Sequence, residues 1–209
     1  MLAISTVTKK AYIALSYNGQ ESFAEIDADC RQSENILLEI DKMLEKNNIT
    51  LREIENIAVV VGPGSFTGIR IGVALVKGLC AGDKSHKVTP ISTLDLMAKI
   101  NIEENKPTKD FICMLNALSG RYFICRYSKE GKKLSEEEMV TEESISKLKL
   151  PIVTLNEEFK DVPGVDISAK HILEEGLSLE RAKKFVSADK LTPVYIRKAQ
   201  AEENLDWKI

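Results

Sequence analysis

The first stretch of the chain passes repeatedly between short apolar runs and turn residues. Residues 2–5 are apolar, residues 6–10 are turn-like, and residues 11–17 are rich in β-forming side chains. Asn18-Gly19 then gives a strong hairpin signal, because both residues tolerate the positive φ of a tight turn. Residues 20–26 continue the β pattern. The opening of the chain therefore predicts a meander of three strands.

A second passage with the same order of signals begins about 110 residues later. Residues 111–115 are apolar, residues 116–120 read as a turn, and residues 121–127 are β-rich. Another turn at residues 128–131 leads into a further stretch over residues 132–140. The repeated pattern predicts two related α/β domains.

The two predicted domains join in a polar stretch near residues 101–109, which contains Pro107. We expect an N-terminal domain over residues 1–104 and a smaller C-terminal domain over residues 105–209. The last segment, residues 198–209, is expected to be helical and to pack on the first domain or on a partner. It contains Trp207, the only tryptophan of the chain.

Helical spacing follows the first meander. The apolar residues that recur at this spacing over residues 33–46 are Ile36, Leu37, Ile40, Met43 and Leu44. Charged residues occupy the opposite face, which is typical of an amphipathic helix. One apolar stripe is expected to pack in the core, and Leu37 with Leu38 could offer a second stripe to a partner.

The remaining pattern alternates helices with one strongly apolar strand. Thr50-x-x-Glu53 is a capping-box signature for a short second helix. Residues 57–61 form a continuous apolar run, which indicates a central strand covered on both faces. Further helices are expected after Ser92 and within residues 168–177.

Composition narrows the class of protein. The chain has 209 residues, 44% hydrophobic and 29% charged, which is ordinary for a globular protein. No apolar run approaches the roughly 20 residues of a membrane helix, and no signal peptide is recognisable, so we expect a cytoplasmic protein. The net charge of −3 argues against a stand-alone nucleic-acid binder, because neutralising phosphates supplies most of such affinity.

Cysteines and histidines give no metal signature. The four cysteines, Cys30, Cys80, Cys113 and Cys125, show no CxxC spacing and are expected to be reduced. The two histidines, His86 and His171, lie far apart in the sequence. No zinc motif can be written with them, and we expect no metal site in this chain.

The segment directly after the apolar strand carries the most information. Gly62-Pro63-Gly64 enforces a tight turn, and Ser65 and Thr67 are candidate caps for the helix that follows. Glycines at positions 68, 72, 78 and 82 repeat at a spacing of four within or just after that helix. Each helical glycine costs about 1 kcal/mol relative to alanine, so close approach of another segment is the expected reason for them.

Two interpretations of this segment compete. Gly64, Ser65, Thr67 and Arg70 could bind an anion, because a helix N-terminus presents free N–H groups. The segment lacks the Lys-Ser/Thr pair of a P-loop, and its glycine spacing is not that of a dinucleotide site. Tight packing is therefore the favoured interpretation from the residues alone.

The same segment resembles a known family. Residues 62–72, Gly-Pro-Gly-Ser-Phe-Thr-Gly-Ile-Arg-Ile-Gly, are similar to the signature of the bacterial TsaB (YeaZ) family of tRNA threonylcarbamoyladenosine biosynthesis proteins. Residues 2–6, Gln32-Ser33 and residues 193–197 resemble its opening strand, first helix and C-terminal element. The resemblance implies the actin-like ATPase fold, an α/β architecture of two RNase-H-like domains with mixed sheets flanked by helices.

Three positions depart from the family pattern. Ser5 stands where the family's first strand usually ends in Asp, and Gln32 stands where it usually has His. Asn116-Ala117-Leu118 replaces an Asp-Ala-Arg element of the second domain. In active members of the fold, the strand-end carboxylate would hold a metal–nucleotide, so Ser5 leaves Mg²⁺ without a charged oxygen ligand.

The resemblance implies a supporting role without catalysis. Family members form a heterodimer with the catalytic, metal-binding TsaD (Kae1 family), which transfers a threonylcarbamoyl group to adenosine 37 of tRNAs that read ANN codons. The ATPase TsaE completes the system. We therefore expect no cofactor in this chain alone, ATP, Mg²⁺ and metal on the partner subunits, and contact with tRNA only through the complex.

The resemblance also implies which surface would dock. The helices over residues 33–46 and 67–82 are expected to contact TsaD, and a homodimer through the same surface is an alternative. The residues that we assign to this interface are Ser33, Leu37, Ile40, Leu44, Thr67, Gly68, Ile71, Gly72, Leu75 and Leu79.

Two other functions remain open from the sequence. One is an enzyme, either a small-molecule kinase of the actin-like fold or a peptidase-like protein. The missing strand-end acid and the missing histidine pair argue against both. The other is a homo-oligomeric protein with a purely structural role.

Overall fold

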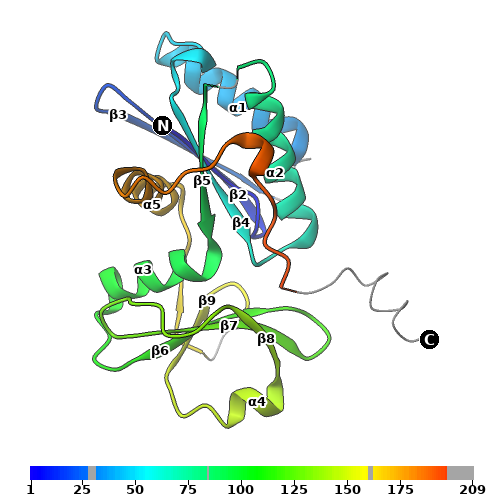
Figure 1. Cartoon of the computed structure of the whole chain (residues 1–209), viewed down its shortest axis with the longest axis vertical. Coiled ribbons are helices and arrows are strands. Elements are labelled where there is room, and N and C mark those ends of the chain that lie inside the picture. The colour runs from blue at the N-terminus through cyan, green and yellow to red at the C-terminus, as the bar shows by residue number, and fades with distance from the viewer. Residues whose placement is uncertain (28–31, 84, 160–161, 197–209) are drawn as a thin grey trace, which may run out of the picture.

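A computed structural model describes residues 1–27, 32–83, 85–159 and 162–196, without the side chains of residues 32–34 and 146. Two sheets lie one above the other, with helices between them and on their outer sides (Figure 1). Each sheet has five strands, in the orders β3-β2-β1-β4-β5 and β10-β9-β6-β7-β8. This two-sheet α/β architecture is that of the actin-like fold expected from the sequence.

The predicted meander supplies the first three strands of the first sheet. Its strands are β1 (Leu2–Ser5), β2 (Lys10–Tyr17), β3 (Gln20–Asp27), β4 (Asn56–Gly62) and β5 (Lys87–Ser92). The strands β1, β2 and β3 pair antiparallel, whereas β4 pairs parallel with both β1 and β5. Every residue of β4 is buried, which confirms the prediction of a central strand covered on both faces.

Helices cover both faces of the first sheet. On one side lie α1 (Gln32–Lys46) and α2 (Phe66–Cys80), and α5 (Ala169–Arg181) lies on the other side (Figure 1). The short helix expected at Thr50 is a single 3-10 turn, η1 (Leu51–Glu53), and it carries the predicted capping box.

The second sheet repeats the antiparallel opening of the first. Its strands are β6 (Phe111–Asn116), β7 (Arg121–Tyr127), β8 (Glu138–Thr141), β9 (Ile152–Leu155) and β10 (Gly164–Val165). The third strand of this unit is shorter than the predicted stretch of residues 132–140, because only an isolated bridge between Tyr127 and Lys133 precedes β8. The remaining helices are α3 (Thr93–Asn105), α4 (Glu142–Ser146) and the 3-10 turn η2 (Ala188–Lys190).

Two helices lie against the sheet of the opposite half of the sequence. The helix α3 belongs to the N-terminal half, yet it contacts β6, β7, β9 and β10 of the second sheet as well as β4 and β5. The helix α5 belongs to the C-terminal half, yet it packs on β1, β2, β4 and β5 of the first sheet. The boundary between residues 104 and 105 stays a prediction, and we describe the halves by their sheets.

Some expectations fall beyond the described residues. These are the helix over residues 198–209 with Trp207 and the state of Cys30. The three other cysteines, Cys80, Cys113 and Cys125, are free and buried, as expected for reduced thiols.

Candidate partner-docking site

The turn between β4 and α2 is built by glycine and by contacts with two distant segments. Gly62 and Gly64 adopt φ values of 109° and 155°, which side chains other than glycine rarely adopt. The Ser65 N–H donates to the Val7 carbonyl at 3.0 Å, and the Val194 N–H donates to the Val61 carbonyl at 2.9 Å. The turn is thus held between the β1–β2 loop and the segment around Val194.

Two of the helical glycines contact this chain itself. A Cβ atom on Gly68 would lie 1.8 Å from the Thr6 carbonyl oxygen, and one on Gly72 would lie 2.6 Å from Thr6 Oγ1. Thr6 Oγ1 also donates to the Gly68 carbonyl at 2.6 Å. Close approach of another segment does explain these glycines, but the approaching segment is the β1–β2 loop and not a partner.

The proposed anion-binding residues are occupied in other ways. Ser65 caps α2, because its Oγ accepts the Gly68 N–H at 3.2 Å. Thr67 lies inside the first turn of α2 and is exposed, so it is not the cap. The Arg70 guanidinium lies over the ring of Phe66, and its Nε donates to Tyr195 Oη. These contacts favour packing as the role of the segment, while anion binding stays a prediction.

The predicted interface residues divide into exposed and buried groups. On α1, Leu37 is 44% exposed, whereas Ile40 and Leu44 are buried against the sheet. On α2, Thr67 is exposed, and Ile71, Leu75 and Leu79 are half-buried. Gly68 and Gly72 are buried, so together with Ile40 and Leu44 they offer no surface to a partner. The side chain of Ser33 lies outside the described part of the structure.

Three exposed residues extend this surface beyond the ten residues assigned to the interface, and one of them, Leu38, was expected with Leu37 as a second apolar stripe. Leu38 is 56% exposed on α1, next to Leu37. Phe66 and Tyr195 are 44% and 48% exposed at the N-terminal end of α2. Phe66 and Tyr195 each have one signal in the sequence. Phe66 lies within the 62–72 motif, and Tyr195 lies within residues 193–197, which resemble a family element.

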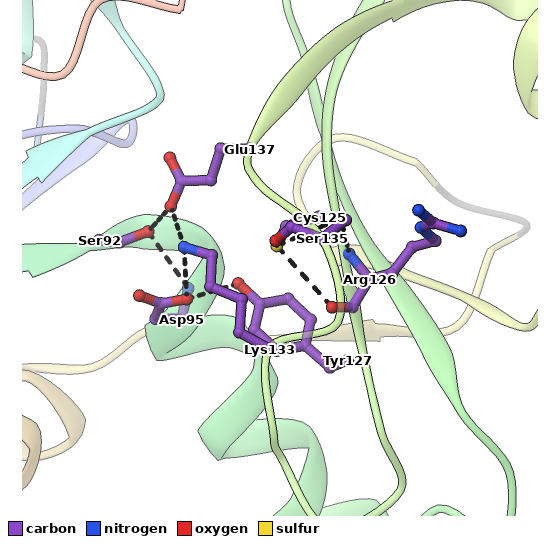
Figure 2. Close-up of polar contacts among 8 residues, drawn as sticks. All are labelled: Ser92, Asp95, Cys125, Arg126, Tyr127, Lys133, Ser135 and Glu137. Atoms are coloured by element: carbon purple, nitrogen blue, oxygen red, sulfur yellow. Dashed lines mark hydrogen bonds and ion pairs between the residues drawn. The ribbon is translucent and has the colours of Figure 1, made fainter.

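A ring of polar contacts ties α3 to the second sheet (Figure 2). Tyr127 Oη donates to Asp95 at 2.6 Å, and Lys133 Nζ lies 3.2 Å from the same carboxylate and 3.0 Å from Glu137. Ser92 Oγ closes the ring, because it donates to Glu137 at 2.6 Å and accepts the Asp95 N–H. Burial and the nearby Asp95 carboxylate raise the pKa of Tyr127 far above its ordinary value, so this phenol stays protonated.

A groove of about 440 Å³ opens beside this ring. Its two lysines, Lys99 and Lys133, are engaged in ion pairs with Glu175 at 3.0 Å and with Asp95 at 3.2 Å. Within the described residues, the groove therefore offers no unpaired lysine to an anionic substrate. These ion pairs and hydrogen bonds connect α3 to α5 and to the second sheet.

Two of the residues that depart from the family pattern, Ser5 and Asn116, have places in the described structure that can be compared with that pattern. Ser5 is fully buried at the end of β1, and its Oγ has no hydrogen-bond partner within the described residues. Asn116 shapes the β6–β7 turn, since its Oδ1 accepts the Leu118 N–H at 2.8 Å. The Asn116 N–H donates to the Glu158 carboxylate. The Glu158 side chain is exposed as a whole, but burial around its carboxyl group raises the pKa of that group. The side chain of Gln32 is not described.

Neither a metal cluster nor a membrane-spanning helix is found in the described part of the chain. Across residues 1–27, 32–83, 85–159 and 162–196, no three His, Cys, Asp or Glu side chains gather closely enough to hold a metal ion. No helix in the same ranges combines the length and apolar character needed to span a membrane.

The fold and the site together define a class. The chain is a two-sheet α/β protein of the actin-like ATPase fold, with an apolar face on α1 and α2 and no acidic residue at the end of β1. It belongs to the family described as "TsaD: tRNA N6-adenosine threonylcarbamoyltransferase", whose pattern matches residues 27–178.

Individual relatives of this chain carry the name TsaB. The chain is 26% identical to the tRNA threonylcarbamoyladenosine biosynthesis protein TsaB of Haemophilus influenzae over 236 aligned positions, which cover 100% of this chain and 95% of that protein. Identity to TsaB of Escherichia coli (strain K12) is also 26%, covering 100% of this chain and 96% of that protein. The resemblance to TsaB inferred from residues 62–72 is thereby confirmed.

A solved structure supports the fold. An uncharacterized Pseudomonas aeruginosa protein with similarity to peptidase YeaZ superposes with a TM-score of 0.76 at 21% identity, covering 94% of this chain and 98% of that chain. At this level of identity the likeness concerns the fold alone.

Proposed function

We propose that this chain is a TsaB-type subunit that acts in the biosynthesis of threonylcarbamoyladenosine in tRNA. In this proposal it catalyses no step itself and activates a TsaD-type catalytic partner by docking on it. The modified base is adenosine 37 of tRNAs that read ANN codons, and a TsaE-type ATPase completes the system in the cytoplasm. ATP, Mg²⁺ and metal belong to the partner subunits, and tRNA is bound only through the complex.

The observation that carries this proposal is the partly exposed apolar surface of α1 and α2, which lie on the same side of the first sheet (Figure 1). We call it the docking face and define it by Leu37, Leu38, Ile71, Leu75 and Leu79. Leu37 and Leu38 are exposed and the three residues of α2 are half-buried. Apolar surface of this kind is typical of protein–protein contact sites. Ser5 supports the non-catalytic part, because a buried hydroxyl replaces the carboxylate that would hold a metal–nucleotide.

The test is binding to the TsaD protein of the same organism. We expect Leu37→Glu to weaken binding at least tenfold in calorimetric titrations, because a charge must then be buried in an apolar contact. Leu134→Glu is the matched control, since Leu134 is 46% exposed near the second sheet, against 44% for Leu37. Its binding should stay within twofold of the unmodified chain.

A second readout separates docking from function. Reconstituted TsaD, TsaE, ATP and tRNA should yield threonylcarbamoyladenosine, measured by mass spectrometry of nucleosides, only when this chain is added. The Leu37→Glu variant should lose most of this stimulation. Equal binding by Leu37→Glu and the unmodified chain would contradict the assignment of the docking face.

Self-association is measured in the same way. Sedimentation of the isolated chain should show a dimer that dissociates as TsaD is added if one face serves both contacts. A dimer that persists at saturating TsaD would place the homodimer contact elsewhere. Tight, magnesium-dependent ATP binding by the isolated chain would favour the small-molecule kinase instead.

A further inference from the structure

An arginine lies over one aromatic ring and beside a second at the N-terminal end of α2. The Arg70 guanidinium carbon lies 3.8 Å from the centre of the Phe66 ring and 5.8 Å from that of Tyr195. Arg70 Nε donates to Tyr195 Oη at 3.0 Å, and the two ring centres are 5.6 Å apart. We call these three residues the arginine clamp.

The chain fixes each member of the clamp by its backbone. Phe66 and Arg70 are four residues apart on α2, so they lie on the same face of the helix. Tyr195 arrives from a segment more than 100 positions away, which is anchored to β4 by the hydrogen bond from Val194 to Val61. The guanidinium is therefore oriented before any partner arrives, and little side-chain entropy is left to lose on binding.

The charge of the clamp has no ion-pair partner in the part of the chain that the structure describes. Among residues 1–27, 32–83, 85–159 and 162–196, no carboxylate lies within ion-pair distance of Arg70. A guanidinium has five N–H donors, and within these residues only Nε–H has an acceptor. Both flanking rings remain exposed by more than two fifths. A fixed arginine that contacts two exposed aromatic rings has the composition of an interface hot spot.

We propose that the arginine clamp anchors the partner protein by receiving an Asp or Glu carboxylate from it. This inference rests on the proposed function for the identity of that partner. A planar guanidinium pairs with a carboxylate through two parallel hydrogen bonds, and the apolar rings exclude water around the pair. The clamp lies on α2, the helix that also carries Ile71, Leu75 and Leu79 of the docking face.

A protein carboxylate fits this surface better than an RNA phosphate. The chain has a net charge of −3, and α2 has only one other basic residue, Lys77. Binding to an RNA backbone draws on several basic residues, since each phosphate contact contributes through counterion release. One fixed arginine among apolar residues is suited to a single carboxylate.

The test compares two substitutions of Arg70 with a control arginine. Arg70→Met keeps an apolar stem over Phe66 but removes the charge, and we expect binding to TsaD to weaken at least tenfold. Arg70→Lys keeps the charge but loses the planar pair of donors, so its binding should weaken by an intermediate factor. Arg126→Met, on the exposed side of β7, should bind within twofold of the unmodified chain. Thermal unfolding of each variant shows whether it is folded.

Charge exchange gives the decisive outcome. Arg70→Glu should abolish binding, and replacing the contacting partner carboxylate with Arg should restore at least a tenth of the original affinity. If Arg70→Met binds TsaD like the unmodified chain while Leu37→Glu does not, the clamp inference is overturned and the proposed function stands. If the unmodified chain does not bind TsaD, the proposed function itself fails. If Arg70→Met binds TsaD like the unmodified chain but its complex with TsaD loses tRNA binding, the inference is also overturned.

Discussion

Gly68 and Gly78 lie on the same helix, yet alanine should have opposite effects at the two positions. At Gly68 an added Cβ would lie 1.8 Å from the Thr6 carbonyl oxygen and 2.9 Å from its carbonyl carbon. Both atoms are backbone, so they cannot rotate away as a side chain would. At Gly78 an added Cβ would meet no atom within 4 Å.

The expected magnitudes follow from these contacts. Gly68→Ala must push α2 away from the β1–β2 loop and weaken the hydrogen bond from Thr6 Oγ1 to the Gly68 carbonyl. Overpacking of this kind costs roughly 1–3 kcal/mol or more, and the better helix propensity of alanine returns about 1 kcal/mol. Because the clash here is with backbone, we expect a gross cost above that range, about 4 kcal/mol, and hence a net loss of about 3 kcal/mol. Gly78→Ala should instead gain up to about 1 kcal/mol.

Thermal and urea unfolding provide the measurement. For a chain of this size, about 1 kcal/mol shifts the midpoint by roughly 2–4 °C. Gly68→Ala should therefore unfold roughly 6–12 °C below the unmodified chain, and Gly78→Ala up to roughly 2–4 °C above it. If Gly68→Ala were as stable as Gly78→Ala, the tight contact with Thr6 would be refuted. Bulky residues at Gly68 or Gly72 would clash with Thr6 and destabilise the fold. A loss of partner binding by such variants would follow from the damaged fold, so these positions cannot test the docking face.

Two further predictions concern buried polar groups. Burial and Asp95 raise the pKa of Tyr127 in the folded chain, whereas the phenol of the unfolded chain ionises near pH 10. The contribution of the protonated phenol to the free energy of unfolding is therefore complete below pH 10. Above pH 10 this contribution falls by at most about 1.4 kcal/mol per pH unit. The stability difference between the unmodified chain and Tyr127→Phe, from urea unfolding, should shrink between pH 9 and pH 11, and a constant difference would contradict the raised pKa. Ser5→Ala removes a buried hydroxyl that has no partner within the described residues and should stabilise the chain by about 1 kcal/mol. A loss of stability in the same assay would mean that the hydroxyl has a role.

Local patterns predicted the elements well, because their causes are local. The Asn18-Gly19 hairpin, the capping box at Thr50 and the buried strand β4 each depend on a few adjacent residues. The repeated meander similarly predicted two related sheets.

Distant contacts were beyond local patterns. The glycine spacing indicated that some segment approaches α2, but only the fold identifies that segment as the loop at Thr6. The helical stripe of α1 did not show that Ile40 and Leu44 are used up by the core while Leu37 stays exposed. The arginine clamp joins positions 70 and 195, and no periodicity connects residues that far apart.

The exchange of α3 and α5 between the two sheets has a consequence for folding. Each sheet has one face covered by a helix from the other half of the sequence, so neither half contains all of its own core. A fragment that ended after residue 104 would leave the face of the first sheet that α5 covers open to water, and the complementary fragment would lack α3 over the second sheet. Separate expression of the halves should therefore give insoluble products, whereas co-expression could restore both cores. In the intact chain the two sheets should unfold in a single cooperative transition.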